Sequence, residues 1–209
     1  PSAILVVSAH WYVPKTMATA MEHPRTIHDF GGFPRALFEI KFPAPGDPAL
    51  AARVRDALAP IPVGLDHQWG LDHGTWSVLY HMVPKADIPV VQLSIDLTQA
   101  PAFHYHVGEL LAPLRDEGIL LLGSGNIVHN LGAYEWDKPE MGPFDWAARF
   151  DRKVRGLIEA GKDEQVVDYP ALGPDADLAV PTPDHYLPLL YILGARRKGE
   201  RATFPVDGF

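Results

Sequence analysis

The chain has 209 residues, of which 47% are hydrophobic and 21% are charged, and these proportions exclude a disordered protein and indicate a folded domain. The formal net charge of −8 at pH 7 argues against partners such as nucleic acid or an anionic membrane surface. Cysteine is absent, which excludes disulfides, thiolate metal sites and thiol nucleophiles. The apolar runs are too short to span a membrane, and we expect a cytoplasmic protein.

Short apolar runs alternate with longer stretches of helical pattern along the chain. In chain order we predict a strand at Ala3–Val7, a strand at Thr16–Met21, a helix at Arg35–Ile40, a helix at Pro48–Leu58, a strand at Val63–Leu65, a helix at Thr75–Met82, a strand at Pro89–Leu93, a helix at Ala102–Asp116, a strand at Ile119–Leu122, a helix at Trp146–Ala160 and a helix at Tyr186–Leu193. This alternation predicts an α/β sandwich with a largely parallel central sheet flanked by helices, formed as a single domain by residues 1–209.

Two histidines follow predicted strands. The chain has 10 histidines and no cysteine, so a transition-metal site would need imidazole and carboxylate ligands. His10 comes after the strand at Ala3–Val7, and His129 comes after the Gly-Ser-Gly turn that ends the strand at Ile119–Leu122. Ligands of open α/β sheets bind beyond the carboxyl ends of the strands. Both histidines are therefore candidate metal ligands or catalytic residues, and the alternative is that each only contacts a neighbouring loop.

Three further histidines lie in loops. His73 follows Asp72, which either orients the imidazole or caps the next helix. His185 lies at the start of the last predicted helix, where it could also face solvent, and His28 lies in a loop rich in glycine and phenylalanine that is either a lid or a plain surface loop. We expect the other five to be surface or core residues: His23, His67, His81, His104 and His106.

Five motifs occur in a recognisable order along the chain. They are Ser-Ala-His-Trp at 8–11, Thr-Ile-His-Asp-Phe-Gly-Gly-Phe-Pro at 26–34, Asp-His-Gly at 72–74, Gly-Ser-Gly-Asn-Ile-Val-His-Asn-Leu at 123–131 and Pro-Asp-His-Tyr-Leu-Pro-Leu-Leu at 183–190. The set resembles the class III extradiol ring-cleavage dioxygenases, and in particular their DOPA-dioxygenase-like branch. The resemblance covers essentially the whole chain and is more specific for the family than for the substrate.

The resemblance implies a role for four of the five motif histidines. It implies that His10 and His185 bind a metal ion, that His129 is an acid/base residue that also approaches the metal in the resting enzyme, and that His73 is its catalytic partner. Family members also open with a strand ending in His-Gly-Ser-Pro, which provides a third ligand, and they have a further strand at the C-terminus. Neither occurs in these 209 residues, so we expect a family segment to be missing at each end.

The function that the resemblance implies is a non-haem Fe(II) dioxygenase that cleaves a small, DOPA-like catechol with O₂ in the extradiol manner. Fe(II) with open coordination positions can hold a catechol and O₂ together, and imidazoles can take and return protons near neutral pH. Zinc outcompetes Fe(II) for nitrogen ligands, so Zn(II) can occupy the site of the purified protein. The candidate substrate contacts are Trp11, His28, Phe30 and Phe33.

Two other functions use the same histidines. A zinc-dependent hydrolase on a related scaffold also needs three ligands and an open position. A non-catalytic binding protein of the same fold is the other alternative, because the third ligand is missing from the sequence. For the dioxygenase, the expected partners are a small aromatic diol and O₂, with no nucleic acid or membrane and with homo-oligomer formation left open.

Overall fold

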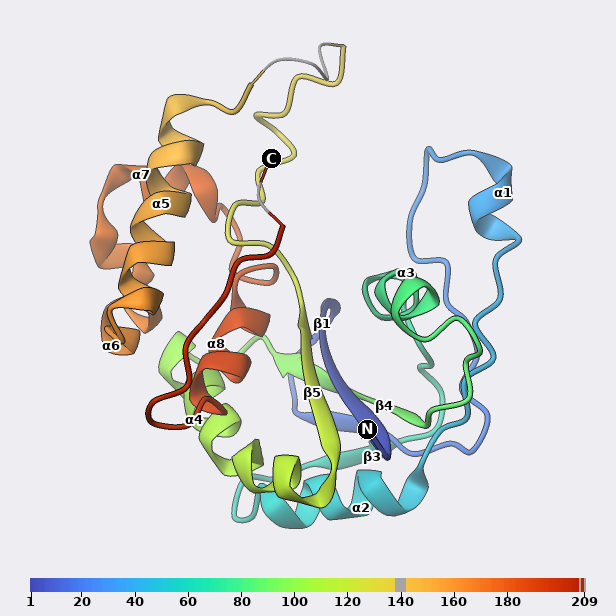
Figure 1. Ribbon diagram of the computed structural model, residues 1–209. Coiled ribbons are helices and arrows are strands. Elements are labelled where there is room, and N and C mark those ends of the chain that lie inside the picture. The colour runs from blue at the N-terminus through green and yellow to red at the C-terminus, as the bar shows by residue number, and fades with distance from the viewer. Residues whose placement is uncertain (138–141, 207, 209) are drawn as a thin grey trace.

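The computed structural model describes residues 1–137, 142–206 and 208. Five strands form one sheet in the order β3-β2-β4-β1-β5, with helices on both faces (Figure 1). The strands are β1 (Ala3–Val13), β2 (Met17–Thr19), β3 (Gly64–Asp66), β4 (Val90–Asp96) and β5 (Ile119–Ser124). β1 is parallel to both β4 and β5, β2 is parallel to β3, and only the single pairing of β2 with β4 is antiparallel. The predicted α/β sandwich with a largely parallel sheet is confirmed.

The predicted helices are present, and the last part of the chain also contains short helices that were not predicted. They are α1 (Arg35–Phe38), α2 (Pro48–Ala57), α3 (His73–Met82), α4 (Pro101–Leu111), the 3-10 helix η1 (Ala112–Glu117), α5 (Asp145–Glu159), α6 (Asp163–Val167), the 3-10 helix η2 (Tyr169–Leu172), α7 (Pro174–Ala179) and α8 (Leu187–Gly194). The elements α6, η2 and α7 were not predicted, because each is too short to show a helical period. None of the helices in the described ranges is long and apolar enough to cross a membrane.

Strand β1 is buried on both faces, which is why its sequence is a continuous apolar run. Ile4 and Val6 belong to a buried cluster that includes Trp76 and Leu79 of α3. The intervening residues of β1 belong to a second, larger cluster that includes side chains of α2, α4 and α8. The strand is therefore held in one position by packing from two layers, and its carboxyl end is correspondingly rigid.

Strand β1 also continues beyond the point where the apolar run predicts its end. Its register with β4 shifts between Val7 and Tyr12, after which pairing resumes to Val13. Such an irregularity re-aims side chains near a sheet edge and is common beside functional sites. His10 is thus a strand residue at the carboxyl end of the sheet, rather than the first residue of a loop.

Helices α4 and α8 pack closely against each other. Gly194 of α8 faces the backbone carbonyl of Tyr105, and Gly108 of α4 faces that of Tyr191, so that neither position has space for a Cβ. Between the helices, the fully buried His104 places Nδ1 2.8 Å from the hydroxyl oxygen of Tyr191. This packing orients α8, and the turn that precedes α8 carries His185.

The buried imidazole of His104 makes stability depend on pH. Burial lowers the pKa of His104 from 6.5 to about 4, so between these values the unfolded chain binds a proton that the folded chain does not. The free energy of unfolding should therefore fall as the pH is lowered through this window, by on the order of 3 kcal/mol for this group. In His104→Asn the loss between about pH 7 and about pH 4.5, measured by urea unfolding of the metal-free chain, should be smaller.

A matched control for this experiment is His106→Asn, which places the same residue at an exposed position of the same helix. It should retain the pH dependence of the parent chain. An equal pH dependence in all three proteins would show that His104 does not resist protonation.

Candidate active site

Four histidines from distant parts of the sequence meet at the carboxyl end of the sheet. His10 comes from β1, His73 is the first residue of α3, His129 follows β5, and His185 precedes α8. Ring centroids are 3.8 Å apart for His10 and His73, 5.0 Å for His10 and His185, and 3.4 Å for His129 and His185, whose rings are stacked. The structure thus brings together four of the five motif histidines, those to which the resemblance gives roles, and we call them the histidine row.

Two carboxylates flank the histidine row, and sequence reasoning had assigned a role to neither. Asp184 is hydrogen-bonded to Nδ1 of the adjacent His185. Asp29 accepts a hydrogen bond of 2.9 Å from the backbone N–H of His73, lies 3.0 Å from Nδ1 of His73, and lies 3.7 Å from Nδ1 of His10. Each carboxylate directly follows or precedes a motif histidine in the sequence, and that adjacency is the signal that could have found it.

Burial keeps imidazoles of the row in the neutral form. Burial, followed by the nearby His73 and His185, lowers the pKa of His10 to about 4. Burial, followed by His185, also lowers the pKa of His129. Because a histidine must be neutral to bind a metal or accept a proton, both side chains are ready for these tasks at neutral pH.

The carboxylates are held in the charged form. Burial acts to raise the pKa of Asp184, but its hydrogen bond to His185 outweighs this effect and leaves the pKa at about 2. Burial likewise acts against ionisation of Asp29, but its contacts with His73 leave its pKa below the ordinary value. Each anion therefore remains charged beside an imidazole Nδ1 at physiological pH.

The residues of the row fit a divalent metal ion. Two groups of three side chains hold their ligand atoms within 4.8 Å of one another: His10, Asp29 and His73, and His129, Asp184 and His185. His10 and His185, which stand edge to face, link the two groups. Because their Nδ1 atoms face carboxylates, their Nε2 atoms are left for a ligand, as in many metal sites where a carboxylate orients a ligating histidine.

The glycine-containing motif after β5 allows the close approach that forms the site. A Cβ on Gly125 would collide with the backbone carbonyl of His185, and the N–H of Asn126 donates a 2.8 Å hydrogen bond to that same carbonyl. Further along, the N–H of His129 donates a 2.8 Å hydrogen bond to the carbonyl of Ala179. The backbone thereby sets the stacking of His129 on His185.

A buried polar network lies beneath the row. It shows whether Asp72 orients the imidazole of His73 or caps α3, the two roles that the sequence left open. The carboxylate of Asp72 accepts hydrogen bonds from Ser8 Oγ at 2.7 Å, from the backbone N–H of Thr75 at 3.1 Å, and from Nε2 of Gln92. Burial raises the pKa of Asp72, although the hydrogen bonds from Ser8 and Gln92 oppose this effect. Asp72 therefore caps α3, and it is Asp29 that contacts the imidazole of His73.

The predicted substrate contacts lie in different places. His28 places Nε2 2.9 Å from the carbonyl of Ile40, within a group of aromatic rings. Phe33 is 52% exposed and contacts Phe30, whose ring lies 5.2 Å from that of His73. Trp11 is only 3% exposed and stacks on Trp69, so the structure places it in the protein interior and not with His10 at the surface of the site.

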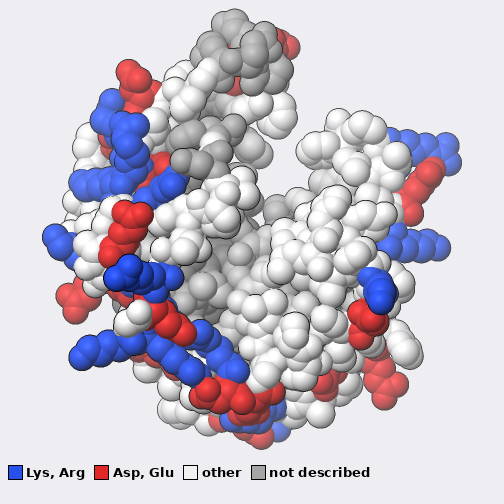
Figure 2. Space-filling model, viewed as in Figure 1, with Lys and Arg blue, Asp and Glu red and all other residues white. Residues whose placement is uncertain are grey.

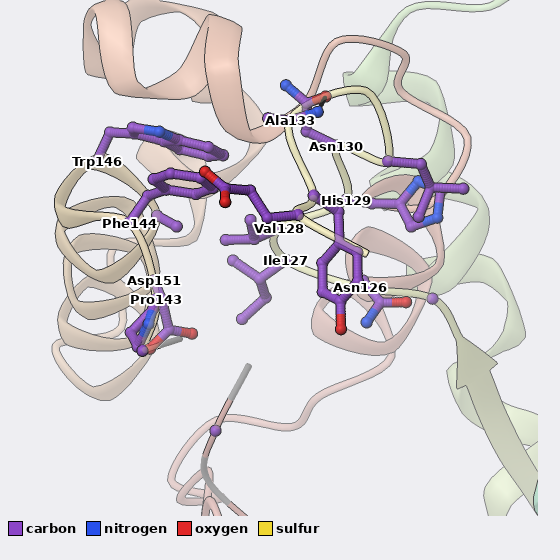
Figure 3. Close-up of a pocket in the computed structure, with 17 residues that line it drawn as sticks. Asn126, Ile127, Val128, His129, Asn130, Ala133, Pro143, Phe144, Trp146 and Asp151 are labelled. Atoms are coloured by element: carbon purple, nitrogen blue, oxygen red, sulfur yellow. Dashed lines mark hydrogen bonds between the residues drawn. The ribbon is translucent and has the colours of Figure 1, made fainter. Parts of the chain in front are cut away.

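A cavity of about 540 Å³ lies beside the row, between the segment after β5 and helix α5. Figure 3 shows Phe144 and Trp146 on one side and Ile127 and Val128 facing them, while His129 belongs to the same wall as Ile127. In the space-filling view a hollow separates two projecting parts of the molecule, and the side chains visible in it are mostly uncharged (Figure 2). The region next to the histidines therefore offers aromatic and apolar surface to a small molecule.

Comparisons with known proteins agree with this chemistry. Residues 1–205 match the family described as the catalytic LigB subunit of aromatic ring-opening dioxygenase. The chain is 53% identical to a protein of Escherichia coli (strain K12) named 4,5-DOPA dioxygenase extradiol, over all of this chain and 78% of that protein. It is 40% identical to the protein of the same name from Beta vulgaris, over 97% of this chain and 76% of the relative.

A solved structure gives the same result for the fold. The crystal structure of an uncharacterized protein from Escherichia coli K12 superposes with a TM-score of 0.86 at 46% sequence identity. The match covers 100% of this chain and 81% of the other.

Gly74 offers a direct test of the histidine row. A Cβ at this position would lie 2.5 Å from Ser8 Oγ and 2.7 Å from Cδ2 of His10, so Gly74→Ala should displace the His10 ring. We expect the affinity for Zn(II), measured by calorimetric titration, to fall about tenfold or more. Overpacking should also lower the free energy of unfolding by about 1–3 kcal/mol.

The control is Gly156→Ala in α5, where a Cβ would meet nothing within 4 Å. This change should leave Zn(II) affinity unchanged and preserve or slightly raise stability. If Gly74→Ala bound Zn(II) as tightly as the parent chain, the position of His10 would not matter for the metal.

Proposed function

The chain belongs to the family of the catalytic LigB subunit of aromatic ring-opening dioxygenases and is an extradiol ring-cleavage dioxygenase, and from this premise we propose that it opens the ring of a small, DOPA-like catechol with Fe(II) as its metal. Members of this family depend on a metal and act on an aromatic substrate with O₂. The proposal for the substrate rests on the names of the relatives, since both of those compared above are named 4,5-DOPA dioxygenase extradiol.

The observation that supports the site assignment is the convergence of the histidine row. We assign His10 and His185 as metal ligands, since a carboxylate faces Nδ1 of each ring. The lowered pKa of His10 also keeps that ring neutral at physiological pH. His129 is assigned as the acid/base residue, and in the absence of substrate it can approach the same ion because its ring stacks on that of His185. Fe(II) held there would acidify a catechol hydroxyl and relay electrons between the ring and O₂.

The other two histidines of the row, His129 and His73, are placed for proton transfer. A neutral His129 can accept the proton of a catechol hydroxyl at its free ring nitrogen and return it to the product. His73 contacts the ring of His10, and its Nδ1 lies 3.0 Å from Asp29. The two histidines thus place one imidazole beside each member of the proposed ligand pair, with His129 against His185 and His73 against His10.

Aromatic side chains provide the surfaces for the substrate ring. Phe30 stands edge to face against His73, and Phe33 and His28 belong to the same aromatic group. On the other side of the row lies the cavity bounded by Phe144 and Trp146. A planar, uncharged ring fits between such surfaces because it can replace water without leaving an unpaired charge.

Anaerobic reconstitution tests the proposed function. The metal-free protein is loaded with Fe(II), its metal content is measured, and O₂ consumption is followed with DOPA, dopamine and unsubstituted catechol. We expect O₂ uptake in a 1:1 ratio with a yellow ring-fission product, strongest with a DOPA-like compound. If the iron-loaded protein consumed no O₂ with any of these diols, the proposal would be wrong.

Replacement of His129 separates proton transfer from metal binding. His129→Ala should lower kcat by roughly 100-fold to 10,000-fold, because the general acid/base is lost. Fe(II) content and the difference spectrum of bound catechol should persist, since His10 and His185 remain. The control His67→Ala removes an exposed imidazole and should keep the parental kcat. A kcat near the parental value in His129→Ala would contradict the assigned role.

A further inference from the structure

We propose that Asp29 is a positioning residue that keeps the proton of His73 and His10 on Nδ1 and thereby joins the aromatic segment around α1 to the metal centre. The inference rests on the proposed function, because it concerns the direction in which the Nε2 atoms of these rings are presented. It assigns a role to a carboxylate that enters the site from a loop and not from the sheet.

One carboxylate faces two imidazoles. Oδ1 of Asp29 lies 3.0 Å from Nδ1 of His73, and Oδ2 lies 3.7 Å from Nδ1 of His10. The two rings themselves are in contact, with centroids 3.8 Å apart. The side chain of Asp29 is only 19% exposed, so solvent weakens these interactions little. Asp29 therefore faces the Nδ1 edges of both rings, within hydrogen-bonding distance of His73 and close enough to His10 for electrostatic attraction.

The consequence for the rings follows from the chemistry of neutral imidazole. Only one ring nitrogen carries the proton, and the hydrogen bond made by one nitrogen decides the state of the other. A carboxylate can only accept, so it selects the form with the proton on Nδ1 and leaves the lone pair on Nε2. In that form His10 can ligate a metal through Nε2, and His73 presents Nε2 as a proton acceptor.

The same side chain attaches the aromatic segment to the site. The base of the segment is fixed by hydrogen bonds from Ile27 N to the carbonyl of Leu71 at 2.8 Å and from Trp76 Nε1 to the carbonyl of Ile27 at 2.7 Å. Beyond this base, helix α1 has no buried residue. Figure 1 shows this part of the chain projecting from the body of the molecule. Asp29 is thus positioned to couple the seating of the segment to the orientation of the two imidazoles.

A purely structural role is the competing explanation. Asp29 also accepts the backbone N–H of His73 at 2.9 Å, and this contact alone would support the start of α3. The variant Asp29→Asn distinguishes the two roles, because its amide oxygen at the Oδ1 position still accepts the backbone N–H of His73 while an amide NH₂ group replaces Oδ2 beside Nδ1 of His10. A structural role predicts no change in the rings. The positioning role predicts that the proton of His10 moves to Nε2, while that of His73 stays on Nδ1 because the Oδ1 position still faces it.

The experiment reads the ring protons directly. Two-dimensional ¹⁵N NMR of the histidine side chains is recorded on the full metal-free chain at neutral pH, with assignments from His10→Gln and His73→Gln. In the parent chain we expect both rings to carry the proton on Nδ1, and in Asp29→Asn we expect Nε2 to become the protonated nitrogen of His10. The matched control is Asp66→Asn, which loses a carboxylate that accepts the N–H of Gln68 at 2.9 Å and that of Trp69 at 2.6 Å, without a change in either ring.

Metal affinity provides the second readout. Titration with Zn(II) should show binding about 10- to 100-fold weaker in Asp29→Asn than in the parent chain, with Asp66→Asn unchanged. The proposal is overturned if the tautomer of His10 is the same in Asp29→Asn and the parent, or if Zn(II) affinity changes by less than about twofold. A parent chain that shows the Nδ1 tautomers but opens no catechol would refute ring cleavage and leave the role of Asp29 intact.

Discussion

The burial of strand β1 between two helical layers is the constraint on which the site depends. Both faces of the strand are packed, and both edges are paired, with β4 on one side and β5 on the other. A strand held in this way has little freedom to slide, because a shift by one residue would exchange its two buried faces. The residues at its carboxyl end, including Ser8 and His10, are therefore fixed in position as well.

The other histidines are brought to this fixed point by close backbone approaches. Gly125 allows the end of β5 to touch the turn that carries His185, and the α4–α8 packing around His104 holds the following helix in place. Asp72, buried and hydrogen-bonded to Ser8, joins the start of α3 to β1 in the same manner. The row is therefore built from backbone contacts and buried polar pairs, which place side chains more accurately than exposed loops do.

The sequence could predict the strands, and His10 and His129 after two of them, because apolar runs and the residues that follow them are local signals. The roles of His73 and His185 came from the motifs that resemble the family. It could not predict the partner of each ring nitrogen, since Asp29 reaches His73 only through the path of a long loop. The placement of Trp11 was missed for a different reason. Because β1 continues past His10, successive side chains point to opposite faces, and the tryptophan turns inward to Trp69. The end of an apolar run is not always the end of a strand.

The dispersed origin of the histidine row has a thermodynamic consequence. Its members come from strand β1, the start of α3, the segment after β5 and the turn before α8. An unfolded chain holds these groups far apart, so it cannot bind an ion with the affinity of the native protein. The free energy of coordination is then added to that of folding, by an amount that grows with the logarithm of free ion concentration. The concentration of free metal in the surroundings would thus set the fraction of molecules that is folded, whether or not substrate is being converted.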